Sequence, residues 1–338
     1  MAYILLSVRN NRLYIDSHNI RHKKVFGVKD MTHSQIEGFR TFIGSDTREL
    51  ILLSKDSDVP RLDIELIFEH SDEFMSWVED NFIDLGQRDA DNELAQIRRN
   101  RELGGTETQR LQTLKSAKTV MRVIGIIACI LCFWALFYPK PYDFVIWACV
   151  IAPLLVLTTI PLSKGIVKFD GRQGGEYPVA AMAFIIPTLS LVIRAIMDWS
   201  FLSWSAFWLP FVGITITVFV LIQVANKSSK PKGVDSFAHL LFCAAYGWAV
   251  TVSLNGVLDS SESQIYPVTV LEKQNSGGKS KTWNLKLAPW ALQSTPEDIE
   301  VSKSKYEAIA VGDTVDVHVR EGAFGMPWYY VKIAQPNE

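Results

Sequence analysis

Five long apolar runs in the middle of this 338-residue chain constrain its fold more than any other feature. Each run approaches the ~20 residues that an α-helix needs to cross a hydrocarbon core of ~30 Å. In lipid, every backbone amide that lacks a partner costs several kcal/mol, so such runs must be helical. We therefore predict an α-helical transmembrane domain over 119–258, with helices at 119–138, 144–162, 179–197, 205–225 and 236–258.

The basic residues near these runs predict how the helices are oriented. They gather before or at the start of the first helix (Arg98, Arg99, Arg101, Arg110, Lys115, Lys118 and Arg122), after the second (Lys164, Lys168 and Arg172) and after the fourth (Lys227, Lys230 and Lys232). The two opposite joints contain Lys140 and no other base. Because cytoplasmic loops are enriched in lysine and arginine, we expect a cytoplasmic N-terminus and an exterior C-terminus.

The net charge and the positions of the cysteines limit which partners and which disulfides we expect. The net charge of −2 is too balanced to indicate a nucleic-acid partner, and all four cysteines lie inside the apolar runs. Neither polar end can therefore form a disulfide. Cys129 and Cys132 form a C-x-x-C, but within an apolar helix we interpret them as packing residues.

Residues 1–87 predict a cytoplasmic α+β domain. Short β-forming runs start with AYILLSV at 2–8 and include IEGFRTFI, RELILLS and LDIELIF, and the run SDEFMSWVEDNF is a helix with Ser71 as its N-cap. This order of strands closed by a helix resembles bacterial pleckstrin-homology-like domains. The resemblance implies a bent sheet plugged by the helix, with free loops at its other end. It also implies binding or adaptor work, toward lipid or protein.

Residues 88–118 predict a helical stalk that leads into the first membrane helix, with a hinge at Gly104 and Gly105. Three arginines in the stalk have two interpretations: Arg98, Arg99 and Arg101 either rest on lipid phosphates or only fix the orientation of the helices. The basic cluster of 21–24 and Lys29 is likewise either a headgroup contact or a solvated strand that discourages edge pairing.

Polar residues inside the membrane runs are few, and Arg194 is the most costly of them. An arginine at mid-membrane costs about 2.5–3.5 kcal/mol and needs a partner, which Asp198 supplies at i, i+4 spacing. The pair is either a polar site within the bundle or an arginine that reaches outward to water and Asp198. We interpret His239 as a packing or interface residue rather than a proton carrier.

Residues 264–338 predict a small all-β exterior domain of the barrel type that oligomer-binding folds use. The β-forming runs alternate with turns at 275–278, Gly312 and Gly322, and Ser302 caps a short helical turn. The stretch VSKSKYEAIAVGDTVDVHV, followed by EGAFGMPWY, is similar to C-terminal modules of uncharacterised bacterial membrane proteins. We expect the domain to fold without the helices, with Trp283, Trp290, Phe324 and Trp328 in its core or in an exposed patch.

Function follows only coarsely from these features. The chain contains no H-E-x-x-H, G-x-S-x-G, P-loop or dinucleotide motif, so we expect no enzyme activity and no cofactor. As a whole it resembles uncharacterised bacterial multi-pass inner-membrane proteins. We expect a scaffold or sensor that links a cytoplasmic binding domain to a periplasmic β-domain, with the lipid bilayer and other envelope proteins as partners. The alternative is a small transporter or channel subunit.

Overall fold

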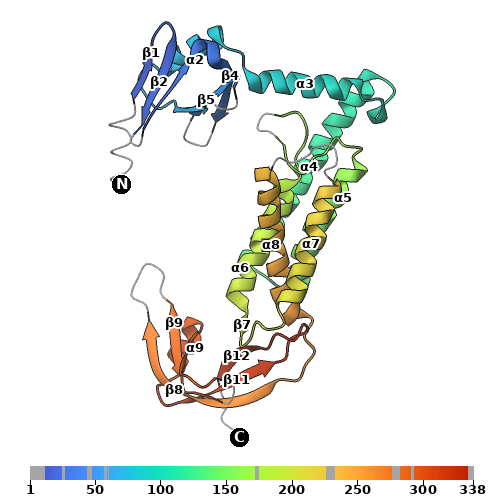
Figure 1. Ribbon diagram of the computed structural model, residues 1–338. Coiled ribbons are helices and arrows are strands. Elements are labelled where there is room, and N and C mark those ends of the chain that lie inside the picture. Colours follow the sequence, from blue (N-terminus) through green and yellow to red (C-terminus); the bar gives the residue numbers. More distant parts are fainter. Residues whose placement is uncertain are drawn as a thin grey trace. The chain divides into compact units, whose positions relative to one another are not determined.

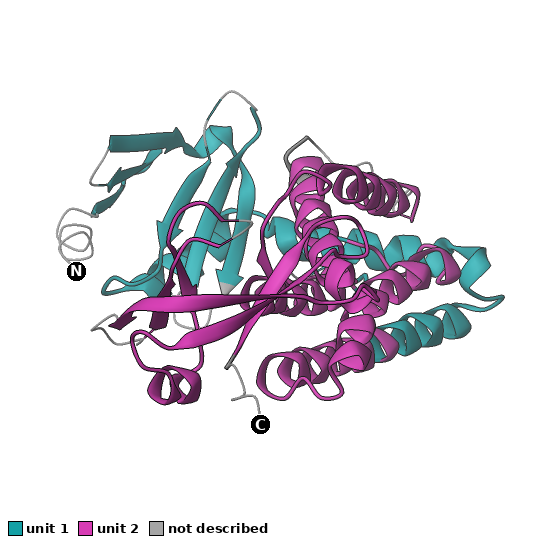
Figure 2. Ribbon diagram, turned by 90° about the horizontal axis from the view of Figure 1, so that it is seen from below, with its two compact units in different colours: residues 1–119, 170–178 teal, residues 120–169, 179–338 magenta. Residues whose placement is uncertain are grey.

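A computed structural model describes residues 12–24, 27–43, 48–56, 59, 61–171, 175–225, 233–275, 282–290 and 293–333. The predicted strand at 2–8 and most of the turn at 275–278 lie outside these residues. The chain forms two compact units, coloured separately in Figure 2. Unit 1 contains Met1–Thr119 and Asp170–Pro178, and unit 2 contains Val120–Phe169 and Val179–Glu338.

Unit 1 begins with two antiparallel three-stranded sheets. The first has the order β1 (Arg12–Ile15), β2 (Asn19–Lys24) and β3 (Gly27–Thr32), and the second has β4 (Ile36–Ile43), β5 (Arg48–Ser54) and β6 (Leu62–Glu65). Apolar side chains that alternate along the strands meet helix α2 (Ser71–Asn81) in one core, which includes Ile20, Leu50, Leu52, Ile64, Phe74 and Val78. Strands followed by a closing helix agree with the expected order, and the resemblance to pleckstrin-homology-like domains stays a prediction.

The start of α2 differs from the prediction. Ser71 is the first helical residue, and the N-cap is His70, whose backbone has a positive φ of 66°. His70 Nδ1 lies 3.2 Å from Glu73 Oε1, so a side-chain contact joins the cap to the first turn. The basic cluster predicted at 21–24 and Lys29 also differs in one member. His22 is only 3% exposed, so its side chain lies in the interior rather than in a solvated cluster.

Two helices follow this domain in the chain. Helix α3 (Leu85–Arg99) is capped by Asp84, whose carboxylate accepts from the backbone N–H of Gly86 and Gln87, and it is joined to β4 by an Arg40–Asp89 ion pair of 2.5 Å. A turn of 3-10 helix (Arg101–Leu103) and the two glycines separate it from α4 (Glu107–Phe137). The chain is therefore helical on both sides of Gly104, and the stalk as a separate part of the protein stays a prediction.

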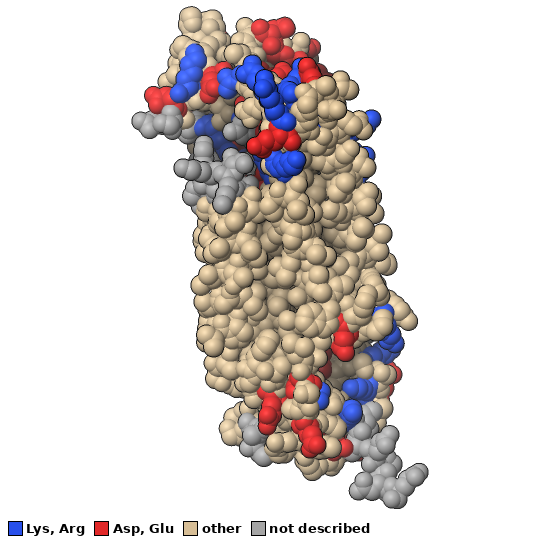
Figure 3. All heavy atoms as spheres, turned by 90° about the vertical axis from the view of Figure 1, so that its right-hand side faces the viewer, with Lys and Arg blue, Asp and Glu red and all other residues tan. Residues whose placement is uncertain are grey.

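Five helices in the described part of the chain are long and apolar enough to cross a membrane, which confirms the prediction of five long apolar helices. They are α4, α5 (Tyr142–Leu162), α6 (Ala181–Asp198), α7 (Trp208–Ala225) and α8 (Gly233–Val257). On the face shown in Figure 3, a broad middle band is almost free of described Lys, Arg, Asp and Glu side chains. Such a surface suits a hydrocarbon environment.

The C-terminal part of unit 2 is one curved antiparallel sheet with the strand order β10-β9-β8-β11-β12-β7 (Figure 1). Its strands are β8 (Gln264–Asn275), β9 (Trp283–Leu287), β10 (Glu297–Glu300), β11 (Thr314–Arg320), β12 (Trp328–Ile333) and β7 (Ser200–Phe201). Ser302 caps the short helix α9 (Lys303–Ala308), as predicted. One strand was not expected: β7 comes from the joint between α6 and α7, so the sheet extends beyond 264–338.

Candidate functional site

The Arg194–Asp198 pair that the sequence predicts is present at the end of α6. Arg194 Nη2 lies 2.7 Å from Asp198 Oδ1, and the two side chains are 13% and 19% exposed. Tyr142, at the start of α5, donates its hydroxyl to Asp198 Oδ2 at 2.7 Å, and the Arg194 guanidinium lies 5.9 Å from the Tyr142 ring centre. Sequence spacing finds the first contact and misses Tyr142, because that residue lies on another helix.

The three stalk arginines have different surroundings. All three are exposed to solvent. Arg98 Nε in addition forms an ion pair of 3.2 Å with Glu107 Oε1. The part of α4 from Glu107 to Thr119, where the apolar run starts, is about 18 Å long at ~1.5 Å per residue. Contact of these arginines with lipid phosphates stays a prediction, and this length counts against it.

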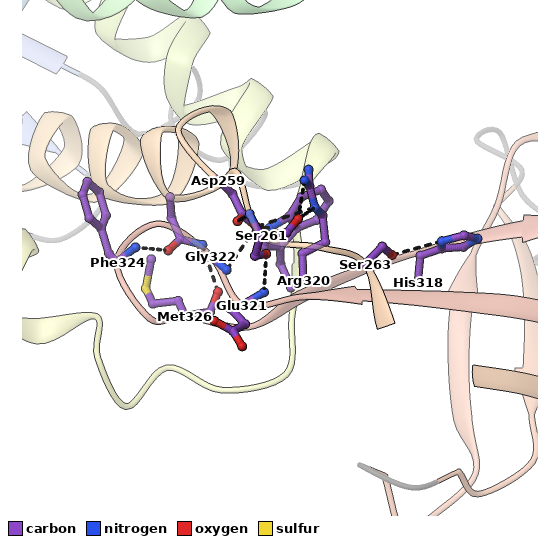
Figure 4. Close-up of polar contacts among 11 residues, drawn as sticks. Asp259, Ser261, Ser263, His318, Arg320, Glu321, Gly322, Phe324 and Met326 are labelled. Carbon is purple, nitrogen blue, oxygen red and sulfur yellow. Dashed lines mark hydrogen bonds and ion pairs between the residues drawn. The ribbon is translucent and has the colours of Figure 1, made fainter. Parts of the chain in front are cut away.

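A denser polar site, which we call the α8 junction, joins the end of α8 to the turn between β11 and β12 (Figure 4). Its residues are Asn255, Asp259, Ser261, Arg320, Gly322, Phe324, Met326 and Trp328. Asn255 is fully buried; its Nδ2 donates to Met326 O at 2.9 Å, and its Oδ1 accepts from Phe324 N at 2.9 Å. One side chain thereby supplies the partners for two backbone groups of the turn.

Asp259 is the charged centre of the α8 junction. Its side chain is only 2% exposed, and it accepts hydrogen bonds from Ser261 N at 2.8 Å, Gly322 N at 3.1 Å and Trp328 Nε1 at 2.7 Å. Burial alone would raise the pKa of this carboxyl, but the hydrogen bonds from Ser261, Trp328 and Gly322 outweigh burial and hold the pKa below its usual value. The carboxylate is therefore held ionised in a buried position.

Arg320 completes the charge balance around Asp259. Its Nε lies 4.0 Å from Asp259 Oδ2, and its guanidinium donates twice to Ser261 O, at 3.0 and 2.6 Å. Glu321 N donates to Ser261 Oγ at 3.1 Å. The segment 259–262, which the sequence presents as a plain polar linker, is thus fixed to β11 by both its backbone and its side chains.

Two glycines, Gly256 on α8 and Gly322 in the β11–β12 turn, allow close contacts at the α8 junction. A Cβ on Gly256 would lie 1.9 Å from the Trp199 ring, which in turn meets the Trp328 ring edge-on at 4.7 Å. Gly322 has a φ of 77°, and a Cβ there would lie 2.3 Å from Met326 O. Both positions therefore require glycine, the first for space and the second also for backbone conformation.

The predicted aromatic residues of the C-terminal domain have separate roles. Trp290 is buried in the core of the sheet, whereas Trp328 is buried at the α8 junction, where it meets the Trp199 ring and donates to Asp259. Trp283 packs on Tyr306 at 4.9 Å between ring centres. Only part of the aromatic surface is thus internal to the domain.

Unit 1 contains a cavity of about 700 Å³ between β1, β6 and α2. Its floor is apolar and includes Ile64, Phe68 and Phe74, and its rim carries Arg12, His70 and three glutamates. A volume of this size suits a small ligand or a peptide segment. Burial of His22, which also lines the cavity, lowers its pKa, with a further contribution from Lys24.

The α8 junction has the chemistry of a structural connection. Its contacts are made by backbone groups and by the side chains of Asn255, Asp259, Ser261, Arg320 and Trp328, each bonded to a neighbour within the junction. Within the described residues, no group of three or more His, Cys, Asp or Glu side chains is placed to hold a metal ion. Comparison with protein families, with curated proteins and with solved structures finds no match for this chain.

Proposed function

We propose that this protein is a multi-pass protein of a bacterial inner membrane, with a cytoplasmic N-terminus and an exterior C-terminus. It acts as a sensor or scaffold that links a cytoplasmic binding domain to an exterior β-domain, without catalysing a reaction. The alternation of basic residues between joints supports the orientation. The cavity of unit 1 supports the binding role. The partners of the whole protein in this proposal are other envelope proteins and the lipid bilayer.

The observation that carries the proposal is the α8 junction. Asp259 follows the end of α8 at Val257 by two residues, and its buried carboxylate holds the β11–β12 turn directly. No flexible spacer separates helix from sheet within this described segment, and β7 ties the α6–α7 joint to the same sheet. A displacement of the β-domain would therefore move the ends of the membrane helices.

A transporter or channel subunit is the second candidate, because several hydroxyl side chains are buried within the bundle. Most of them are already paired with their own helices: Thr188 donates to Phe184 O at 2.8 Å and Thr251 to Gly247 O at 2.7 Å. The segment after α5 also turns back into the bundle, where Ile166 and Phe169 are each 1% exposed. These features favour a packed connection over a conducting path.

Reporter fusions test the orientation. A reporter placed after Glu338 should be active only outside the cytoplasm, and one placed near Gly104 only inside it. Activity of the Glu338 fusion in the cytoplasm would refute the five-helix topology that we propose.

Hydrogen exchange of the full-length protein in lipid nanodiscs tests the coupling. Asn255→Ala should accelerate amide exchange both in the turn 321–327 and in the last two turns of α8, whereas Gly213→Ala on α7 should accelerate neither. Acceleration confined to 321–327 would contradict a mechanical link. In parallel, solute flux into proteoliposomes that contain the wild-type protein would favour the transporter alternative.

A further inference from the structure

The corner between α3 and α4 is held together by side chains, although its two glycines suggest a hinge (Figure 1). Arg110, one turn into α4, donates from Nε to Gly104 O at 2.8 Å and from Nη2 to Gly105 O at 3.1 Å. Its Nη1 donates to Arg98 O in the last turn of α3. One guanidinium thus binds three carbonyls on both sides of the corner.

Two more side chains of α4 satisfy the backbone of the corner. Gln109 Oε1 accepts from Gly105 N at 3.0 Å and from Thr106 N at 3.2 Å. Thr113 Oγ1 donates to Leu103 O at 3.0 Å. The backbone N–H and C=O groups of the corner are thus hydrogen-bonded to side chains of α4. Bending at this corner would therefore break several hydrogen bonds at once.

The α5–α6 loop contacts both helices of this corner through Glu176. Glu176 N donates to Glu93 Oε2 on α3 at 2.7 Å, and its carboxylate accepts from Lys118 Nζ on α4 at 2.6 Å. Next to it, burial and the Glu93 carboxylate raise the pKa of the Tyr177 hydroxyl. We call Glu93, Lys118 and Glu176 the α3 brace.

The ion pair of the α3 brace is partly open to solvent. The side chains of Lys118 and Glu176 are 42% and 30% exposed. An ion pair with that exposure contributes little and is weakened by salt. The base of the loop, in contrast, is closed by backbone bonds from Ala180 N to Lys168 O at 2.9 Å and from Ala181 N to Phe169 O at 2.8 Å.

We propose that residues 85–119 form one rigid lever, bent at 100–106, and that Glu176 is the releasable latch that holds this lever to the α5–α6 loop. Breaking the ion pair to Lys118 leaves the bond from Glu176 N to Glu93 as the remaining contact of the brace, and that bond can then open without opening the corner. The inference deepens the proposed sensor function and rests on it for its purpose, because a released lever would change how the N-terminal domain is presented.

Amide exchange at single residues, measured on the full-length protein in nanodiscs, tests this proposal. The probes are Glu176 N for the latch, and Gly105 N and Thr106 N for the corner. The variants are Glu176→Gln, which removes the charge of the latch, and Arg110→Met, which removes the three corner bonds. Lys115→Met is the matched control, since it removes an exposed cation one turn before Lys118 on the same helix.

For Glu176→Gln we expect exchange at Glu176 N to accelerate roughly two- to fivefold, as befits a half-exposed pair, with the corner probes unchanged. Raising salt from about 0.05 to 0.5 M should have the same effect on the wild type and little further effect on the variant. Arg110→Met should accelerate the corner probes, and the control should change none of them.

Three results would overturn the proposal. Acceleration of the corner probes together with the latch probe in Glu176→Gln would mean that the corner is a hinge. Unchanged exchange at Glu176 N would mean that no latch exists, and unchanged corner probes in Arg110→Met would mean that the guanidinium does not hold the corner. If Arg110→Met fails to fold, Arg110→Lys keeps the charge while losing bonds and gives the same readout. These probes lie outside α8, so their failure is distinguishable from failure of the α8 coupling test.

Discussion

The α8 junction and the α3 brace both connect segments that are distant in the sequence, and both contain a carboxylate near a basic side chain. They differ in burial. Asp259 is 2% exposed and accepts three N–H donors, whereas the Glu176 side chain is 30% exposed and pairs with a lysine that is 42% exposed. In the first case the protein replaces the water that the carboxylate loses; in the second, water remains a competitor for the same charge.

This difference in burial predicts that the two contacts open in different ways. Removing one partner of a buried, fully bonded group leaves others unpaired, so such a contact persists or fails as a whole. A half-exposed pair can open while its members are rehydrated. The comparison therefore predicts large effects at the α8 junction and small, salt-dependent ones at the α3 brace.

The largest effect is expected for Asn255→Ala. The change leaves Met326 O and Phe324 N without their partners, and each orphaned group costs about 1–3 kcal/mol, so a total loss of about 2–6 kcal/mol follows. The free energy of unfolding can be measured by titration with a denaturing detergent. Asn92→Ala, an exposed change on α3, is the control, and equal losses in the two variants would show that the junction does not stabilise the fold.

Asp259→Asn should follow, with a loss of about 1.5–3 kcal/mol at neutral pH, the range for hydrogen bonds to a charged group. Since the pKa of Asp259 is lowered in the folded protein, its contribution is complete above the unfolded-state pKa near 3.8 and is lost as the pH falls through the lower folded value. The difference in stability between wild type and variant should thus stay constant above about pH 5 and shrink below about pH 4. A difference that grew on acidification would show the opposite linkage.

Gly256→Ala probes packing at the same junction without touching its hydrogen bonds. The new methyl group would overlap the Trp199 ring, and overpacking of this kind costs about 1–3 kcal/mol. Gly213→Ala on α7 adds the same methyl group where no atom lies within 4 Å, so it should not destabilise the protein and should add up to about 1 kcal/mol of helix propensity. Equal thermal stability of the two variants would mean that Trp199 moves aside freely, and the close contact between α8 and Trp199 would then carry no weight.

The features predicted correctly from the sequence are those set by local patterns. Hydrophobic runs give the five long apolar helices, and i, i+4 spacing gives the Arg194–Asp198 pair. The α8 junction could not be predicted, because Asn255 meets residues about 70 positions later in the chain, in a turn whose position depends on how the sheet folds back. A signal was present: an asparagine inside an apolar helix must find a partner.

An unexpected strand and the hinge prediction, which stays untested, show the same dependence on contact partners. β7 has only two residues, too few for any alternation to be visible, and it becomes a strand because β12 offers it an edge. Gly104 and Gly105 suggest a hinge from their intrinsic freedom, but Gln109 and Arg110 use the polar groups of that corner. In both cases the outcome depends on partners that sequence neighbours alone do not identify.

The smallest effect is expected at the α3 brace, and it is the sharpest check on the comparison. Lys118→Met and Glu176→Gln, combined in a double-mutant cycle, should give a coupling energy of about 0–1 kcal/mol at low salt, because both partners keep much of their hydration. The coupling should decline as salt shortens the Debye length from about 10 Å at 0.1 M to about 3 Å at 1 M. The parallel cycle of Asp259→Asn with Trp328→Phe, which removes the indole donor, should show a larger coupling that salt hardly changes, since the bond is buried. A coupling at the brace as large and as insensitive to salt as that at the junction would mean that exposure does not separate the two contacts, and Glu176 could then not serve as a releasable latch.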